Sequence, residues 1–127
     1  MNLQDIKSAR TAQKEIIYFR EKLEAVKSRD PMPIYSMYWS MAAREHFLEK
    51  HAREIRMWED RIQERQAIVD RVLDWAAGQP ADIQKIVLLR AVELMEWPEI
   101  SVKVCSSTTP NTAYMRLKRA LEASEAA

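Results

Sequence analysis

The chain of 127 residues holds one glycine and one cysteine. Glycine supplies the turns of sandwiches and barrels and the backbone of phosphate-cradling loops, so its scarcity argues against those folds. A single cysteine excludes an internal disulfide and a thiolate metal site, which favours a reducing compartment. The longest aliphatic run, residues 86–89, is too short to span a bilayer, and the first residues lack the pattern of a signal peptide. We therefore expect a cytoplasmic protein without a membrane partner.

Neither sign of charge is in excess, because 20 basic side chains nearly balance 19 acidic ones and the formal net charge is only +1. A nucleic-acid-binding protein often shows a strongly basic composition, and this chain does not. The basic side chains are nevertheless clustered. Residues 1–29 carry seven basic against four acidic side chains, and residues 103–121 carry four basic side chains and no acid. Any contact with DNA is therefore expected through a small patch.

The first 77 residues show the periodicity of helices. Residues 2–29 have apolar side chains at helical spacing, and Pro31 and Pro33 then predict a turn. Residues 36–77 contain neither glycine nor proline, and an apolar side chain recurs there at every seventh position, at Met41, Leu48, Ile55, Ile62, Val69 and Ala76. This pattern favours one long helix over two helices that break near residues 50–54. Its partner would be residues 2–29, in an antiparallel hairpin, or a second copy of the chain.

A strong helix breaker follows at Gly78 and Pro80, where we place the domain boundary. The predicted fold is all-α, with a long helical hairpin or coiled-coil arm over residues 1–79 and a helix-turn-helix domain over residues 80–127. Asp82 is the expected cap of the next helix, and Pro98 lies in the first turn of a further one. Trp75 and Trp97 are expected to be partly buried beside Leu88, Leu89 and Ile100.

The last segment has the pattern of two short helices joined by a polar turn. Ile100 and Val104 give the first a buried side, and Thr109 followed by Pro110 is a typical start for the second. Ala113, Leu117 and Leu121 then form a buried face at four-residue spacing. The opposite side is polar and basic, as major-groove entry requires, although a solvated C-terminal helix would look similar. The candidate DNA-contacting residues are Lys103, Thr109, Asn111, Thr112, Tyr114, Met115, Arg116, Lys118 and Arg119.

Within this candidate surface we expect different contacts. Asn111 and Tyr114 should lie nearest to bases, and the basic side chains should meet phosphates. Adjacent helical residues point about 100° apart. Arg116 and Arg119 are therefore expected to face the DNA, with Lys118 toward the flank.

Three segments of the chain also resemble parts of a known protein family. They are Leu88-Leu89-Arg90, Trp97-Pro98-Glu99-Ile100-Ser101 and Thr109 to Leu121 with Thr112, Ala113, Arg116, Leu117, Arg119 and Ala120. They resemble the helix-turn-helix of sigma-factor region 4, as found in small phage and prophage proteins, over about residues 62–123. The turn departs from that pattern, because it lacks glycine, is about two residues longer and has Ser106 where an apolar residue is common. The resemblance implies a DNA-binding transcriptional regulator.

No pattern of catalytic residues is present. His46 and His51 are five residues apart and so lie on different helix faces, which disfavours a metal site. The serines and threonines of residues 106–109 have no neighbouring His–Asp pattern, so we expect no enzyme and no cofactor. The predicted partners are double-stranded DNA and further copies of the chain, as a homodimer or higher oligomer. An adaptor that binds RNA polymerase or another protein, or an oligomeric structural or packaging component, is the alternative.

Overall fold

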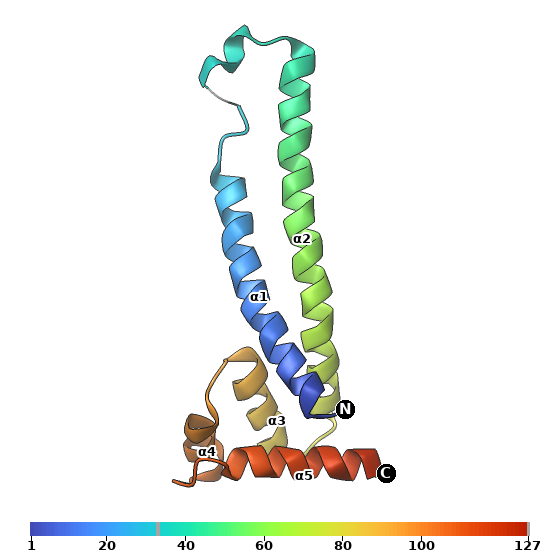
Figure 1. The fold of residues 1–127 in the computed structure, drawn as a ribbon, viewed down its shortest axis with the longest axis vertical. Helices are drawn as coiled ribbons and strands as arrows, with labels where there is room; N and C mark the ends of the chain where they lie inside the picture. Colours follow the sequence, from blue (N-terminus) through green and yellow to red (C-terminus); the bar gives the residue numbers. More distant parts are fainter. Residues whose placement is uncertain (33, 127) are drawn as a thin grey trace. The chain divides into compact units, whose positions relative to one another are not determined.

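The computed structural model describes residues 1–32 and 34–126, so Pro33 of the predicted turn lies outside the described residues. The described residues form helices and no strand, which confirms the predicted all-α class. In chain order the elements are α1 (Leu3–Ser28), a 3-10 turn η1 (Ile34–Tyr38), α2 (Met41–Ala77), α3 (Ala81–Val87), a π-helical turn η2 (Leu88–Val92), α4 (Trp97–Cys105) and α5 (Thr112–Ala126) (Figure 1). None of these helices is both long and apolar enough to cross a membrane.

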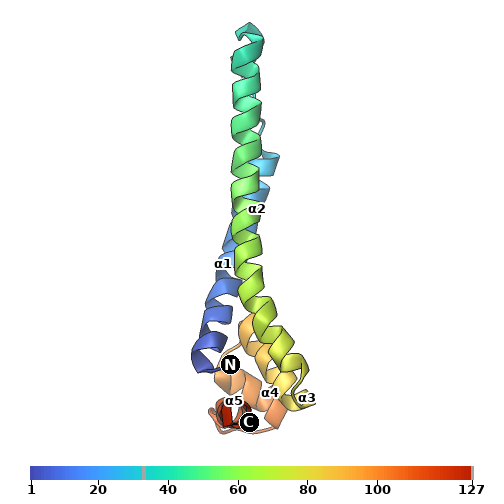
Figure 2. The ribbon, with the colours of Figure 1, turned by 90° about the vertical axis from the view of Figure 1, so that its right-hand side faces the viewer.

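The chain divides into two compact units, and both long helices contribute to each. The first unit contains Met1–Glu15 and the chain from Arg65 onward, and the second contains Ile16–Glu64. Within each unit α1 and α2 lie side by side (Figures 1 and 2). The boundary that we placed at residues 79 and 80 falls inside the first unit.

Helix α2 is continuous over 37 residues, so the alternative of two helices is wrong. It begins at Met41 and not at Ser36, because residues 34–38 form the 3-10 turn. The Ser40 hydroxyl accepts a hydrogen bond from the Ala43 amide at 3.2 Å, which caps the new helix. Arg44 donates to the Ser36 and Met37 carbonyls at 3.1 and 3.0 Å and so holds the 3-10 turn against the first turns of α2.

The seven-residue stripe of α2 changes its environment along the helix. In the second unit Met41 and Leu48 are 72% and 48% exposed, whereas in the first unit Val69 and Ala76 are only 1% and 4% exposed. An α-helix has 3.6 residues per turn, so a seven-residue repeat rotates by about 20° per heptad around a straight helix. Within the first unit, the end of the stripe is buried because Ala76 belongs to the core of that unit.

The second unit is a helical hairpin, as predicted. Ile16, Leu23 and Val26 are the buried side chains of its α1 segment. The Phe19 ring lies 5.6 Å from that of Trp58 on α2. Two polar contacts join the end of α1 to α2. His51 Nε2 bonds the Val26 carbonyl at 2.9 Å, and Arg29, just after α1, pairs with Glu54 at 2.6 Å.

The first unit has a core to which every one of its helices contributes. The buried members of this core are Ile6, Ala9, Val72, Ala76, Ile83, Ile86, Val87, Ala91, Ile100, Ala113, Leu117 and Leu121. Trp75, Trp97 and Leu89 pack against it and are partly buried, which confirms the prediction for both tryptophans. Leu88, in contrast, is 43% exposed, so its predicted place in this core is wrong. It belongs to η2, where the helix widens before the chain turns toward α4.

Candidate nucleic-acid interface

Helix α4 ends in a turn that uses no glycine. Ser106 adopts the left-handed conformation with φ 49° and ψ 35°. The Ser107 amide donates to the Ser101 carbonyl at 3.1 Å, which closes the Schellman-type end of the helix. A left-handed serine is less favourable than a glycine by about 1–2 kcal/mol, so neighbouring contacts must hold this turn.

Those contacts are hydroxyl hydrogen bonds within residues 107–112. The Thr109 amide donates to Ser107 Oγ at 3.1 Å, and the Thr112 hydroxyl donates to the Thr109 carbonyl at 3.2 Å. Ser107 Oγ and Thr112 Oγ1 are 2.9 Å apart. Because the single Thr112 hydroxyl hydrogen already points to Thr109, Ser107 is the donor of this last bond. The polar turn is thus ordered by its own serines and threonines.

The predicted start of α5 at Thr109 and Pro110 is wrong. The helix begins at Thr112, and its first backbone bond runs from the Met115 amide to the Asn111 carbonyl at 2.9 Å. Thr109 instead accepts the turn bond from the Thr112 amide at 3.3 Å. Pro110 and Asn111 therefore belong to the turn, because the hydroxyl network ties residues 107–112 together before the helix starts.

Ser101 supplies the contact that Thr109 was expected to make. Its Oγ accepts from the Ala113 amide at 3.1 Å and donates to the Pro110 carbonyl at 3.0 Å, and its side chain is fully buried. A side chain of α4 thereby satisfies a free N–H group in the first turn of α5. The sequence shows Ser101 only as a polar residue between Ile100 and Val102, and nothing local identifies its partners.

The predicted cap at Asp82 is also wrong. Pro80 occupies the cap position of α3 and makes no side-chain cap bond, while Asp82 lies in the first helical turn. Its carboxylate lies 3.4 Å from the guanidinium of Arg116 on α5, and both side chains are about 40% exposed. The Arg116 side chain of α5 therefore contacts α3 through this ion pair.

Tyr114, another candidate DNA-contacting residue, packs against an aromatic ring of α4. The Tyr114 ring meets that of Trp97 edge-on, with centroids 5.4 Å apart. The Arg90 guanidinium lies 4.6 Å from the centre of the same tryptophan ring. Tyr114 is half-buried in this stack, so its ring helps to join α4 to α5.

Two arginines hold the connection between η2 and α4. Arg10 of α1 donates to the Leu94 carbonyl at 3.0 Å and to Glu96 at 2.9 Å, and Arg90 donates to the Met95 carbonyl at 3.0 Å. Leu94 is left-handed, with φ 60°, and these bonds hold the carbonyls at that turn. The hydrogen bond from Arg10, followed by its charge, holds the pKa of Glu96 below its ordinary value. Burial, followed by the charge of Arg10, lowers the pKa of Arg90.

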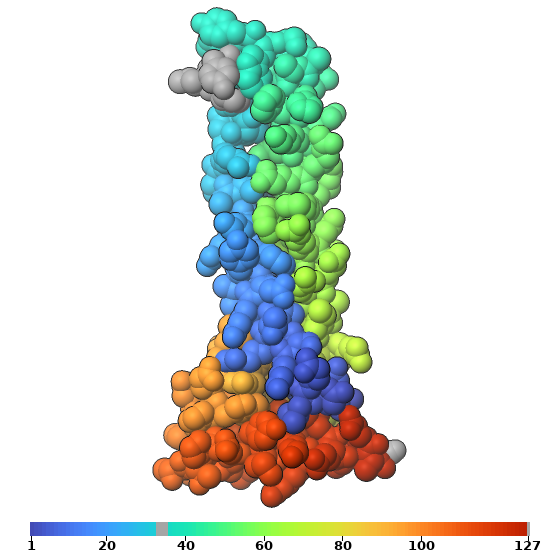
Figure 3. All heavy atoms as spheres, in the orientation of Figure 1, coloured from blue at the N-terminus to red at the C-terminus, as the bar shows by residue number. Residues whose placement is uncertain are grey.

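The predicted buried face of α5 is confirmed, because Ala113, Leu117 and Leu121 are all buried. Helix α5 lies at the molecular surface in the space-filling view (Figure 3). The nine candidate residues divide by exposure. Six are exposed, namely Lys103, Thr109, Asn111, Met115, Arg116 and Arg119, and three are half-buried, namely Thr112, Tyr114 and Lys118.

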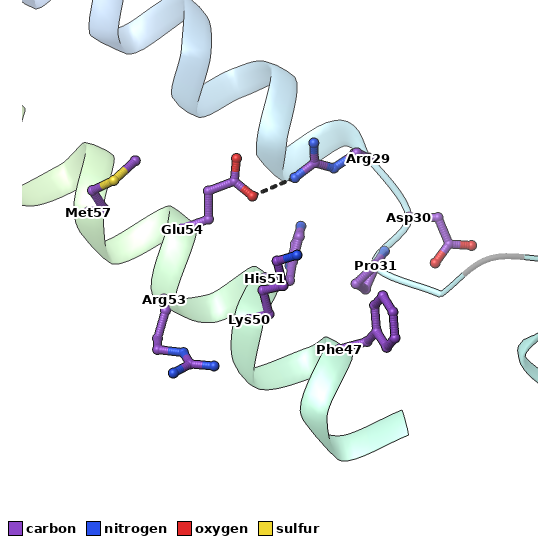
Figure 4. Close-up of a pocket in the computed structure, with 9 residues that line it drawn as sticks. All are labelled: Arg29, Asp30, Pro31, Phe47, Lys50, His51, Arg53, Glu54 and Met57. Atoms are coloured by element: carbon purple, nitrogen blue, oxygen red, sulfur yellow. Dashed lines mark hydrogen bonds and ion pairs between the residues drawn. The ribbon is translucent and has the colours of Figure 1, made fainter. Parts of the chain in front are cut away.

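The second unit contains a hollow of ≈ 730 Å³ beside the end of α1. Figure 4 shows the residues around it: Arg29, Asp30, Pro31, Phe47, Lys50, His51, Arg53, Glu54 and Met57. The pairing of Arg29 with Glu54 and the bond from His51 to Val26 engage three of its charged or polar groups in the hairpin itself. Among the described residues, no three histidine, cysteine, aspartate or glutamate side chains gather in a way that would hold a metal ion.

Comparison with known proteins finds no matching protein family, no matching curated protein and no matching solved structure. The function is therefore proposed from the geometry of the chain itself. In that geometry α5 combines a buried face with an outward face that carries exposed polar and basic side chains.

The Ser101 contact generates a stability prediction. Replacing Ser101 with alanine leaves the Ala113 amide and the Pro110 carbonyl without their hydroxyl partner in a buried place. We expect a loss of about 1–3 kcal/mol in the free energy of unfolding, measured by denaturant titration. Ser8→Ala on the exposed side of α1 is the control and should change it by less than about 0.5 kcal/mol. Equal stability of the two variants would contradict the proposed capping role.

The lowered pKa of Glu96 generates a pH prediction. A carboxyl whose pKa is lower in the folded state stabilises the fold above its unfolded pKa, and that contribution disappears as the pH falls through the folded value. Glu96→Gln should therefore be less stable than the wild type at pH 7, and the difference should shrink as the solution is acidified. Glu99→Gln, an exposed glutamate of α4 without a described ion pair, is the control. A difference for Glu96→Gln that stays constant from pH 7 to acid would refute the ion-pair explanation.

Proposed function

We propose that the protein binds double-stranded DNA through α5 and acts as a small transcriptional regulator of the phage or prophage type. The observation that carries this proposal is the Ser101 link between α4 and α5, with bonds of 3.1 and 3.0 Å to the start of α5. A first helix that orients a second, outward-facing helix through a short turn is the arrangement with which helix-turn-helix proteins enter the major groove.

The distribution of charge supports the same surface. Lys103 in the last turn of α4 and Arg119 on α5 are exposed, and no ion pair involving either is found among the described residues. No acidic side chain occurs in residues 103–121, so nothing in that segment repels a phosphate. Basic side chains at both helices of such a motif position it on the DNA backbone.

DNA binding is tested by fluorescence anisotropy with a random 30-bp duplex at about 50 and 200 mM salt. A small number of phosphate contacts should weaken binding by about tenfold to a hundredfold between the two concentrations. Lys103→Ala should lower the slope of log affinity against log salt by about 1. Arg20→Ala, which removes the same charge from the exposed side of α1, is the matched control and should leave it unchanged.

Two outcomes would contradict this assignment. A loss of binding in Arg20→Ala but not in Lys103→Ala would place the DNA on the basic first helix. A wild-type protein that ignores DNA yet retains RNA polymerase would instead favour the adaptor function.

We further propose that the protein acts as a homodimer or higher oligomer. Met41 and Leu48 on α2 are large apolar side chains that remain exposed in the hairpin. A single helix-turn-helix makes few contacts, and association doubles them.

Replacing both Met41 and Leu48 with lysine should therefore yield a monomer in analytical ultracentrifugation. Its helical circular dichroism should be unchanged, because neither side chain is buried in the hairpin. Arg53→Ala and Lys50→Ala, at other exposed positions of α2, provide the control. A wild-type protein that already sediments as a monomer would refute association without bearing on DNA binding.

A further inference from the structure

The buried face of α5 determines which residues of the helix point away from the protein. Ala113, Leu117 and Leu121 follow one another at four-residue spacing and are buried. A shift of two residues along a helix rotates the side chain by about 200°. Met115 and Arg119, two positions before Leu117 and Leu121, therefore lie on the opposite side of α5. Asn111, the last residue of the turn, accepts the first backbone hydrogen bond of α5 from the Met115 amide and so continues this row at the start of the helix. All three are exposed.

Three of the four other candidates on α5 make contacts within the protein, and the fourth is half-buried. Tyr114 packs on Trp97, and the Thr112 hydroxyl takes part in the network of the turn. Arg116 pairs with Asp82 at 3.4 Å, and Lys118 is half-buried. Among the described residues, no side-chain hydrogen bond or ion pair of Asn111, Met115 or Arg119 is found that would have to break before the row met another molecule.

We propose that Asn111, Met115 and Arg119 are the residues that read the bases, whereas Arg116 contributes to phosphate binding alone. This inference rests on the proposed DNA-binding function. A carboxamide bonds the N6 and N7 edge of adenine, an arginine bonds the O6 and N7 edge of guanine, and an apolar side chain contacts the thymine methyl group. Because the three side chains favour different bases, the row can distinguish adenine, guanine and thymine.

The spacing of the row fits successive positions in the groove. Residues four apart on a helix are separated by about 6 Å along its axis. Base pairs in duplex DNA are stacked about 3.4 Å apart. Each member of the row therefore meets a position about two base pairs from the position that its neighbour meets.

The experiment is selection of binding sites from a random duplex pool by the wild-type protein, followed by the same selection with single variants. Asn111→Ala, Met115→Ala and Arg119→Ala should each relax the preference at one position of the selected site. Asn111→Ala and Arg119→Ala should each lose about 5- to 150-fold affinity for that site but little for random DNA. Arg116→Ala is the matched control and should weaken all sequences by the same factor.

Base analogues test the chemistry of each contact. Uracil in place of the thymine facing Met115 removes one methyl group, which should weaken the wild type about fourfold and leave Met115→Ala unaffected. Replacing the guanine facing Arg119 with 7-deazaguanine removes the N7 acceptor, which should weaken the wild type but not Arg119→Ala.

The results separate this inference from the proposed function. A wild-type protein that selects no sequence and binds no duplex contradicts both. A wild-type protein that selects a site whose preferences change in Arg116→Ala, but not in the three variants of the row, overturns the inference and leaves DNA binding intact. Site-specific relaxation in each of the three variants supports it.

Discussion

The core shared by all helices of the first unit is the constraint on which the rest of this structure depends. Helices α3, α4 and α5 contain 7, 9 and 15 residues, lengths at which an isolated helix is marginal in water. Their apolar faces meet around Ile86, Ile100 and Leu117, and Ile6 and Ala9 of α1 complete the same core. The surface of α5 is therefore presented by a unit that needs residues from both ends of the chain.

Polar contacts then determine how the short helices are oriented on that core. Ser101 joins α4 to the start of α5, and Ser106 provides the left-handed turn that a glycine would otherwise supply. Arg10 holds the carbonyl of Leu94 at the other end of α4. Ser101 is buried and Arg10 is half-buried, so removing either side chain leaves unsatisfied polar groups, which is costly inside a protein. The outward direction of Met115 and Arg119 follows from the burial of Leu117 and Leu121 against that core.

The sequence predicted correctly those structural features that depend on residues close together in the chain. The continuous α2, its end before Gly78, and the buried spacing of Ala113, Leu117 and Leu121 are all read from periodicity and helix breakers. The roles of Ser101 and Arg10 were missed, because their partners lie 12 and 84 residues away in the chain. The start of α5 was misplaced for the same reason, since a hydroxyl from another helix replaces the local cap at Thr109.

DNA binding through α5 can be followed by the chemical shifts of backbone amides during titration with a short random duplex. We expect the shifts at low salt to concentrate on Lys103, Asn111, Met115 and Arg119 and to fade as salt is raised. Residues 16–64 should be unaffected. Shifts that instead follow Lys14 and Arg20 along α1, with α5 unchanged, would contradict the claim.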